Sequence, residues 1–321
     1  MPAVSSPFPQ FVQAPAPDAA RLRDALALGL LDPAAHVAPK YFYDALGSRL
    51  FEAITELPEY YPTRTEAAIF QRHAAEMAEW LGRGHTLVDL GAGNGAKAAR
   101  LFSALQPRRY VAVDISVEYL RQALSALQRE HPQMPMLGVG CDFSETLELP
   151  PEAGDEPRLL FYPGSSIGNF TPAQALVFLR QARRESLGGQ LLIGVDLLKA
   201  SDILVPAYDD PLGVTAAFNR NLLLHVNALL GSDFDVRDWQ HEALFNALHA
   251  RIEMHLQARH PVTVRWPGAE RRFAAGERIH TENSCKYRLE DFEALLRAAG
   301  FAQLHAWTDA RRWFAVLAAR G

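Results

Sequence analysis

Cysteines, long hydrophobic runs and an excess of basic residues are all missing from this sequence or scarce in it. Only Cys141 and Cys285 occur in 321 residues, which is too few for a disulfide framework or an all-cysteine metal site and favours a reducing, cytoplasmic location. No stretch approaches the roughly 18–20 apolar residues that a membrane helix needs, and the N-terminus lacks a basic region followed by an apolar run. We therefore expect a protein that neither spans nor crosses a membrane.

The charged residues and histidines argue against two further classes. Lys and Arg number 32 against 37 Asp and Glu, and no dense basic run is present, so the electrostatic attraction that nucleic-acid binders use is missing. The 11 histidines include no H-x-x-x-H or H-E-x-x-H motif. We expect neither a nucleic-acid partner nor a metal site.

The residues that are present predict an α/β fold. The hydrophobic share is 49% and the charged share 21%, which is ordinary globular usage. From Thr86 onward, short aliphatic runs alternate with amphipathic helical segments, a pattern typical of βαβ units and a doubly wound, mostly parallel sheet. The seven expected strands, of which the last two form a hairpin, lie within residues 86–90, 109–115, 136–143, 158–163, 190–198, 302–309 and 312–320.

The regions outside this alternation are expected to form an arm and an inserted lobe. Residues 1–20 are rich in Pro, Ala and Ser and predict a flexible arm. After the fifth strand, residues 199–258 follow a mostly helical pattern, and strand-like runs follow at 262–267 and 271–284. A loop is expected at 57–66, before a helix at 67–81. We assign residues 21–60, 82–198 and 286–321 to the core, and residues 61–81 and 199–285 to a mixed, mostly helical substrate-binding lobe.

A glycine-rich turn predicts a ligand site at the edge of the sheet. Residues 89–95 (DLGAGNG) follow a hydrophobic strand and precede a helix, and Gly91 lies where the backbone can approach a ligand. Such a turn is weak evidence alone, but Asp114 ends the next strand, where it can accept both ribose hydroxyls. Asp142 and Phe143 follow the third strand and offer an acceptor for an exocyclic amine beside an aromatic face. The spacing indicates an adenosine cofactor.

The details of the turn separate two cofactor classes. NAD-binding turns read G-x-G-x-x-G, whereas this turn reads D-x-G-x-G-x-G, and the chain ends in a helix and hairpin. These features resemble the class I S-adenosylmethionine-dependent methyltransferases. A methyltransferase is favoured over an oxidoreductase.

Residues 164–168 (GSSIG) match the G-x-S-x-G pattern of a hydrolase nucleophile. In a hydrolase the helix begins at the nucleophile, but here the helix start signal is Thr171 with Pro172, several residues later. We therefore expect this loop to offer backbone groups, at Gly164, and the side chain of Asn169 to a ligand.

The insertion returns to the core through the segment 281–286 (TENSCK). On an extended strand, Glu282 and Ser284 point the same way because they are two residues apart. A carboxylate and a hydroxyl on one face can bind a donor-bearing ring such as imidazole.

Five blocks together carry a family resemblance, from about Pro39 to the C-terminus. In order and spacing they resemble the L-histidine Nα-methyltransferases that begin ergothioneine biosynthesis. The blocks are KYFYDALGSRLFEAITELPEYYPTRTE, YPGSSIGNFTP, AYDDPLGVTAAFNRN, RIEMHL and AAGERIHTENSCKYR. The resemblance implies transfer of three methyl groups from S-adenosylmethionine to the α-amino nitrogen of L-histidine, giving the betaine hercynine, by a monomeric protein.

The resemblance also implies roles for individual residues. It places Tyr60 in the histidine pocket, where we expect it to orient the amine and help remove its proton. The other residues expected to bind the substrate are Gly164, Asn169, Tyr208, Met254, Glu282 and Ser284, of which Asn169 and Tyr208 hold the carboxylate and the last three surround the imidazole. The residues expected to bind the cofactor are Tyr43, Gly91, Lys97, Asp114, Asp142 and Phe143. Asn283 and Tyr287 depart from some relatives, which affects fine specificity alone.

Two alternatives stay open at this stage. One is a related methyltransferase that acts on another amino acid, such as tryptophan. The other is a non-catalytic protein that binds the amino acid and the cofactor without turning them over.

Overall fold

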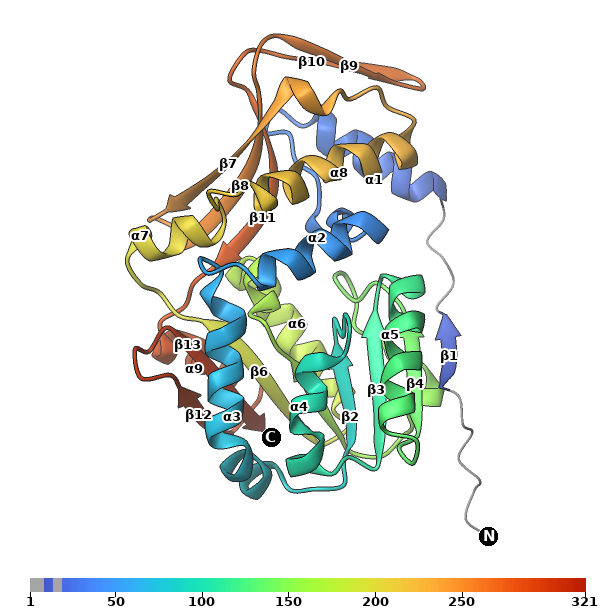
Figure 1. The fold of residues 1–321 in the computed structure, drawn as a ribbon, viewed down its shortest axis with the longest axis vertical. Helices are drawn as coiled ribbons and strands as arrows, with labels where there is room; N and C mark the ends of the chain where they lie inside the picture. The colour runs from blue at the N-terminus through green and yellow to red at the C-terminus, as the bar shows by residue number, and fades with distance from the viewer. Residues whose placement is uncertain (1–8, 14–18) are drawn as a thin grey trace. The chain divides into compact units, whose positions relative to one another are not determined.

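The computed structural model describes residues 9–13 and 19–321, and these residues divide into two compact units (Figure 1). Of the described residues, the first unit contains 9–13, Pro62–Leu198 and Lys286–Gly321, and the second contains 19–61 and Lys199–Cys285. In the described part of the chain, no helix is long and apolar enough to cross a membrane.

The first unit contains an eight-stranded sheet with the order β1-β4-β3-β2-β5-β6-β13-β12. Neighbouring strands are parallel except that β13 pairs antiparallel with both β6 and β12. The strands are β1 (Gln10–Gln13), β2 (Thr86–Leu90), β3 (Arg109–Asp114), β4 (Met136–Gly140), β5 (Arg158–Tyr162), β6 (Gln190–Asp196), β12 (Gln303–Thr308) and β13 (Phe314–Arg320). The seven predicted strands and the terminal hairpin are confirmed.

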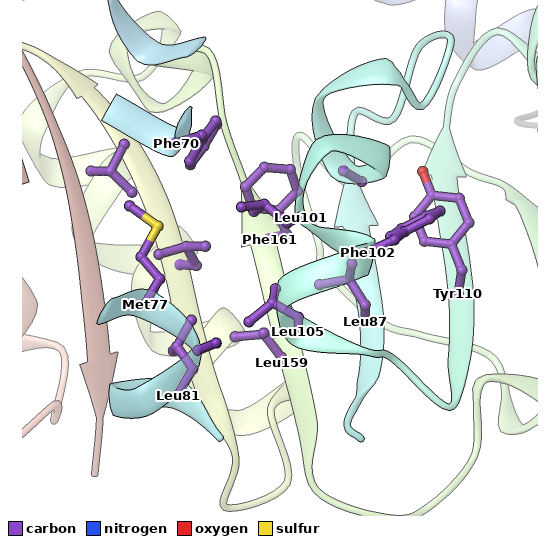
Figure 2. Packing of buried hydrophobic residues seen from close by; sticks show 14 of the residues in the cluster. Phe70, Met77, Leu81, Leu87, Leu101, Phe102, Leu105, Tyr110, Leu159 and Phe161 are labelled. Carbon is purple, nitrogen blue, oxygen red and sulfur yellow. The ribbon is translucent and has the colours of Figure 1, made fainter. Parts of the chain in front are cut away.

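Three helices cover one face of this sheet. They are α3 (Tyr61–Leu81), α4 (Ala96–Leu105) and α5 (Val117–Glu130), and their buried side chains join those of the strands in one hydrophobic cluster. Figure 2 shows part of this cluster, in which Met77 and Leu81 of α3, Leu101 of α4 and Phe161 of β5 lie close together. The parallel strands are buried on both faces, which explains their nearly continuous apolar sequences.

The opposite face is covered by α6 (Pro172–Glu185), which in turn packs against α9 (Leu289–Ala298). Tyr162 alternates with Phe161 along β5, and its ring lies 4.7 Å from that of Phe178 in α6. Thr171 caps α6 in a capping box with Gln174, so the helix begins where the sequence predicts it. Helices on both faces make the sheet doubly wound, as expected.

The first strand, β1, was not expected from the sequence. Gln10–Gln13 pairs in parallel with β4, and the ring of Phe11 lies over Gly138, where a Cβ would overlap it. The guanidinium of Arg121 lies 4.5 Å from the centre of that ring. The prediction of a flexible arm is therefore wrong for residues 10–13, because the ring of Phe11 packs between Gly138 and Arg121. The rest of the predicted arm, residues 1–8 and 14–18, lies outside the described residues.

The second unit combines helices with two small antiparallel sheets. The helices are α1 (Ala19–Leu31), η1 (Pro39–Phe42), α2 (Ala45–Thr55), α7 (Ser201–Leu204), η4 (Val205–Ala207), α8 (Val214–Leu230) and η5 (Val236–Asp238). One sheet has the order β11-β8-β7 and the other pairs β10 with β9. The strands are β7 (Trp239–Asn246), β8 (Arg251–Ala258), β9 (Val262–Trp266), β10 (Ala269–Phe273) and β11 (Arg278–Cys285).

The helical prediction for residues 243–258 is wrong, because β7 and β8 form a hairpin there. In β8, Ile252, Met254 and Leu256 alternate with Glu253 and His255, a period of two that the good helix formers in this stretch obscure. The predicted strands at 262–267 and 271–284 are confirmed in position as β9, β10 and β11.

The division of the chain also differs from the expected one. Residues 19–61 belong to the second unit because α1, η1 and α2 pack on α8. The rings of Phe42 and Phe218, for example, stack 4.5 Å apart. Residues 62–81 belong to the first unit because α3 buries Ile69 and Met77 in its core. This helix begins at Tyr61 rather than Ala67, since a proline is tolerated in the first turn.

Candidate functional site

The glycine-rich turn joins β2 to α4 in a conformation that requires glycine. Gly91, Gly93 and Gly95 have φ angles of 72°, 54° and 71°, in the left-handed region. No atom outside its neighbours lies within 4 Å of the Cβ position of Gly93, so the backbone there is open to a ligand. Hydrogen bonds join the turn to the end of β3, where the N–H groups of Gly91 and Ala92 both donate to the carbonyl of Val113.

Asp114 fastens this turn to the neighbouring strand. Its Oδ2 accepts a hydrogen bond from the N–H of Gly93 at 2.9 Å, and its Oδ1 accepts one from the N–H of Ser116 at 2.8 Å. Burial raises the pKa of Asp114, although these N–H donors act in the opposite direction. A carboxylate has about four acceptor positions, so both oxygens keep lone pairs for hydroxyl donors.

Phe143 lies beside the glycine turn. Of the atoms near the Cβ position of Gly91, the nearest is the ring Cζ of Phe143, at 3.8 Å. The ring contacts Tyr162 edge-on and Phe178 at a tilt, with centroid distances of 6.0 and 6.2 Å, which fixes its orientation. An open turn, a carboxylate on the next strand and a fixed aromatic ring are thus brought together, and this combination fits an adenosine group. Asp142, the residue before Phe143 in the chain, accepts a hydrogen bond from the N–H of Ser144 at 2.9 Å.

A buried glutamate that the sequence analysis missed connects two of the expected ligand-binding segments. Glu66 of α3 is 1% exposed, and its carboxylate accepts hydrogen bonds from Lys97 Nζ at 2.8 Å and from the N–H of Gly164 at 2.7 Å. Gly194 in β6 makes room for it, because a Cβ there would overlap the carboxylate. A glycine inside a buried strand indicates such a close approach, so Gly194 was the available signal.

The loop after β5 is held at a second point. Ser165 has a φ of 59°, and its Oγ accepts a hydrogen bond from the N–H of Asp196 at 2.8 Å. Ser166–Asn169 then form a short 3-10 turn, η3, before α6 begins at Pro172, and Asn169 is half-buried at the end of this turn. The separation of Ser166 from α6 agrees with the argument against a hydrolase.

The second unit brings together five of the residues expected to bind the substrate. Met254 in β8 pairs with Glu282 in β11, and Ser284 lies two residues further along that strand. The hydroxyl of Tyr208 lies 2.7 Å from Ser284 Oγ, and either group can be the donor. The ring of Tyr60 contacts that of Tyr208 edge-on at 6.1 Å.

Tyr43 lies in the second unit as well, although the other residues expected to bind the cofactor lie in the first. Its ring is edge-on to Phe51 at 5.8 Å and to Phe218 at 6.0 Å, and Phe51 in turn contacts Tyr60 at 6.3 Å. An aromatic row therefore runs from Tyr43 through Phe51 and Tyr60 to Tyr208.

Comparison with known proteins agrees with this geometry. Residues 22–321 match the family described as histidine-specific methyltransferase, SAM-dependent. The chain belongs to this family. It is 44% identical to the histidine N-alpha-methyltransferases of Mycolicibacterium smegmatis and Mycobacterium tuberculosis, over 90% of this chain and 91% of each relative. It is also 32% identical to ergothioneine biosynthesis protein 1 of Neurospora crassa, over 83% of this chain and 31% of that one. The resemblance stated from the sequence blocks is confirmed.

Membership of the family makes S-adenosylmethionine the cofactor, and the first unit fits it. The open backbone at Gly93 suits close approach of a ligand, and Asp114 suits two ribose hydroxyls. The ring of Phe143 suits a purine face. The side chain of Lys97 is 35% exposed, and two of its three donors remain beyond the bond to Glu66.

Proposed function

We propose that this protein transfers three methyl groups from S-adenosylmethionine to the α-amino nitrogen of L-histidine, giving the betaine hercynine in the first step of ergothioneine biosynthesis. The observation that carries the proposal is the group formed by Tyr208, Met254, Glu282 and Ser284 in the second unit. The names of the relatives in Mycolicibacterium and Neurospora support the reaction and the pathway.

Glu282 is assigned to the imidazole of the substrate. A carboxylate accepts a charge-assisted hydrogen bond from an imidazole N–H, and another amino acid leaves this acceptor without that donor. The cost of such a loss is about 1–3 kcal/mol or more. Ser284 supplies a second polar contact and Met254 an apolar one, so the three residues together favour histidine over tryptophan.

Tyr208 and Asn169 are assigned to the α-carboxylate, and Gly164 is assigned to the substrate without a contact to that carboxylate. The N–H of Gly164 already donates to Glu66, so we assign the role of Gly164 to its carbonyl and its lack of a side chain. The cofactor supplies a methyl group on a sulfonium when it is bound. The residues assigned to bind it are Tyr43, Gly91, Lys97, Asp114, Asp142 and Phe143.

Tyr60 is assigned to the amine. An α-amino group has a pKa of about 8 and must be neutral to attack, so much of it has to lose a proton at neutral pH. The phenol oxygen of Tyr60 is assigned to orient this nitrogen and to help remove its proton. No covalent intermediate with the protein is required, because the reaction is a displacement that depends mainly on alignment.

The experiment that tests the proposal is mass spectrometry of the purified protein with S-adenosylmethionine and an equimolar mixture of amino acids. We expect histidine alone to gain three methyl groups. Methylation of another amino acid would contradict the histidine pocket, and binding of both ligands without methylation would indicate a non-catalytic protein.

Two substitutions test the assigned residues. Glu282→Ala should raise KM for histidine at least about tenfold and leave the affinity for S-adenosylhomocysteine unchanged, whereas Glu270→Ala, at an exposed position of β10, should change neither. Tyr60→Phe should slow turnover more at about pH 7 than at about pH 9, where the free amine is abundant. Equal losses for both ligands in Glu282→Ala, or turnover by Tyr60→Phe that equals the wild type throughout, would remove these assignments.

We further propose that the protein acts as a monomer in the cytoplasm. The low number of cysteines supports a cytoplasmic location. Size-exclusion chromatography with light scattering tests the oligomeric state, and a dimer at micromolar concentration would contradict it.

A further inference from the structure

The strand that carries Glu282 contains one extra residue just before it. In the pairing of β11 with β8, His280 lies opposite His255, but Glu282 lies opposite Met254, so the register shifts between these two positions. Thr281 is the extra residue, and the pairing continues regularly after it, with Asn283 opposite Glu253. The strand therefore has a β-bulge at Thr281.

This bulge decides which face of the sheet displays Glu282. Side chains alternate between faces along a strand, and directly paired residues share a face. With a continuous register from His280, Glu282 would lie opposite Glu253 and on the face of His255. The extra residue instead moves Glu282 and Ser284 to the face of Met254, since a one-residue slip reverses every side chain that follows.

Contacts on the face of His255 agree with this interpretation. On this face, His280 Nε2 lies 3.0 Å from Asn283 Oδ1, and His255 Nε2 lies 3.3 Å from Glu253 Oε2. That face is thus occupied by a polar network, in which Glu253 also accepts a hydrogen bond from Arg251. A second carboxylate there would meet the charge of Glu253 directly, which destabilises paired strands.

The side chain of Thr281 secures the bulge. Thr281 is fully buried, and its hydroxyl donates to the carbonyl of Met254 at 3.0 Å. Met254 is the residue opposite the bulge, so this bond joins the extra residue to the strand that carries the other side of the imidazole pocket. Further along β11, the hydroxyl of Ser284 lies 2.7 Å from that of Tyr208.

We infer that Thr281 is a positioning residue that sets the specificity for histidine, because its bulge and its hydroxyl direct Glu282 to the face of Met254 and Ser284. Thr281 acts through Glu282 and does not itself contact the substrate. This inference rests on the proposed function, since it assigns a cause to the geometry of the imidazole pocket.

Thr281→Val tests the inference, because valine keeps the shape and burial of threonine and removes the hydroxyl. We expect KM for histidine to rise about tenfold, while the affinity for S-adenosylhomocysteine stays within about twofold of the wild type. Thr281→Ser is the matched control: it retains the hydroxyl and should keep KM within about threefold of the wild-type value.

A double-mutant cycle separates positioning from general stability. In Glu282→Ala, the further change Thr281→Val should raise KM for histidine less than about twofold, because the group that it positions is gone. The inference is overturned if the valine variant retains the wild-type KM, if it loses affinity for both ligands equally, or if its full effect persists without Glu282. Wild-type protein that does not methylate histidine would overturn the proposed function together with the inference, so the two failures are distinguishable.

Discussion

Buried acidic side chains surround the glycine turn of the first unit. Asp89, the first residue of the motif, is 1% exposed, and its Oδ2 accepts a hydrogen bond from the hydroxyl of Tyr110 at 2.7 Å. Burial raises the pKa of Asp89 to about 7, against the opposing effects of the Tyr110 hydrogen bond and the charge of Lys97. The negative charges of Asp114 and Glu66 act in the same direction as burial.

This pKa predicts a pH dependence of stability at one residue. In the unfolded chain Asp89 ionises near its ordinary pKa of 3.8, whereas in the folded protein it keeps its proton to about pH 7. Asp89 therefore stabilises the folded state fully below the unfolded pKa, and this contribution is lost as the pH rises toward 7. Asp89→Asn cannot ionise, so its free energy of unfolding relative to wild type should increase between about pH 5 and about pH 7.

Urea unfolding at the two pH values checks this prediction. Asp235→Asn is the control, since Asp235 has a pKa of about 2, lowered by hydrogen bonds from Arg237, and is ionised throughout this range. A relative stability of Asp89→Asn that stays constant with pH would show that Asp89 is already ionised in the folded protein.

At the residue scale, side chains that follow predicted strands were recognisable from sequence. Gly91, Asp114 and Phe143 were found because the carboxyl ends of parallel strands meet at one edge of a sheet. Glu66 and Thr281 were not found. The importance of Glu66 depends on partners 31 and 98 residues away, and that of Thr281 on the register of two strands.

At the scale of elements, an ion pair joins two segments at the point where the chain leaves the first unit and returns to it. Asp196 ends β6, and Lys286 follows β11; their side chains are 1% and 0% exposed, and Lys286 Nζ lies 2.8 Å from Asp196 Oδ2. The backbones also meet here, since the N–H of Tyr287 donates to the carbonyl of Asp196 and that of Leu198 to the carbonyl of Tyr287.

Breaking this pair should destabilise the first unit strongly. Lys286→Met keeps the length of the side chain but leaves Asp196 without its buried cation, and we expect a loss of about 3–5 kcal/mol in the free energy of unfolding. The control is Arg297→Met, which removes an exposed pair with Glu293 in α9 and should cost no more than about 1 kcal/mol. Chemical denaturation measures both, and equal losses would contradict the special role of the buried pair.

Secondary structure was predictable where the period was clear. The buried strands of the first unit, such as Gln190–Asp196, are continuous apolar runs between turn residues, and Thr171 with Pro172 marks the start of α6. The hairpin of β7 and β8 was mistaken for a helix because its alternation is short and its residues include strong helix formers.

At the scale of the whole molecule, the proposed ligand roles divide largely between the two units. Most of the residues assigned to the cofactor lie in the first unit, and five of those assigned to histidine lie in the second. Each unit is built from segments far apart in sequence, so each ligand would stabilise a discontinuous part of the chain.

Hydrogen exchange should display this division. Because a ligand at about 100 times its Kd stabilises the state that binds it by about 2.7 kcal/mol, S-adenosylhomocysteine alone should slow exchange at residues 91–95 and 141–143. Histidine should slow exchange at 252–256 and 280–285. The β9–β10 hairpin is the internal control and should exchange equally in all samples. Protection by histidine confined to 91–95 would contradict the assignment of Glu282 and Ser284.

The fold class, the family and the types of residue in the site follow from local order in the chain. Alternating periods specify strands and helices, and the blocks from KYFYD to TENSCKYR specify the family, because both are properties of neighbouring residues. The face on which Glu282 lies, the burial of Glu66 and the unit to which α3 belongs depend instead on contacts between distant segments. No local pattern encodes those contacts, since strand register and core packing are set by partners that folding brings together.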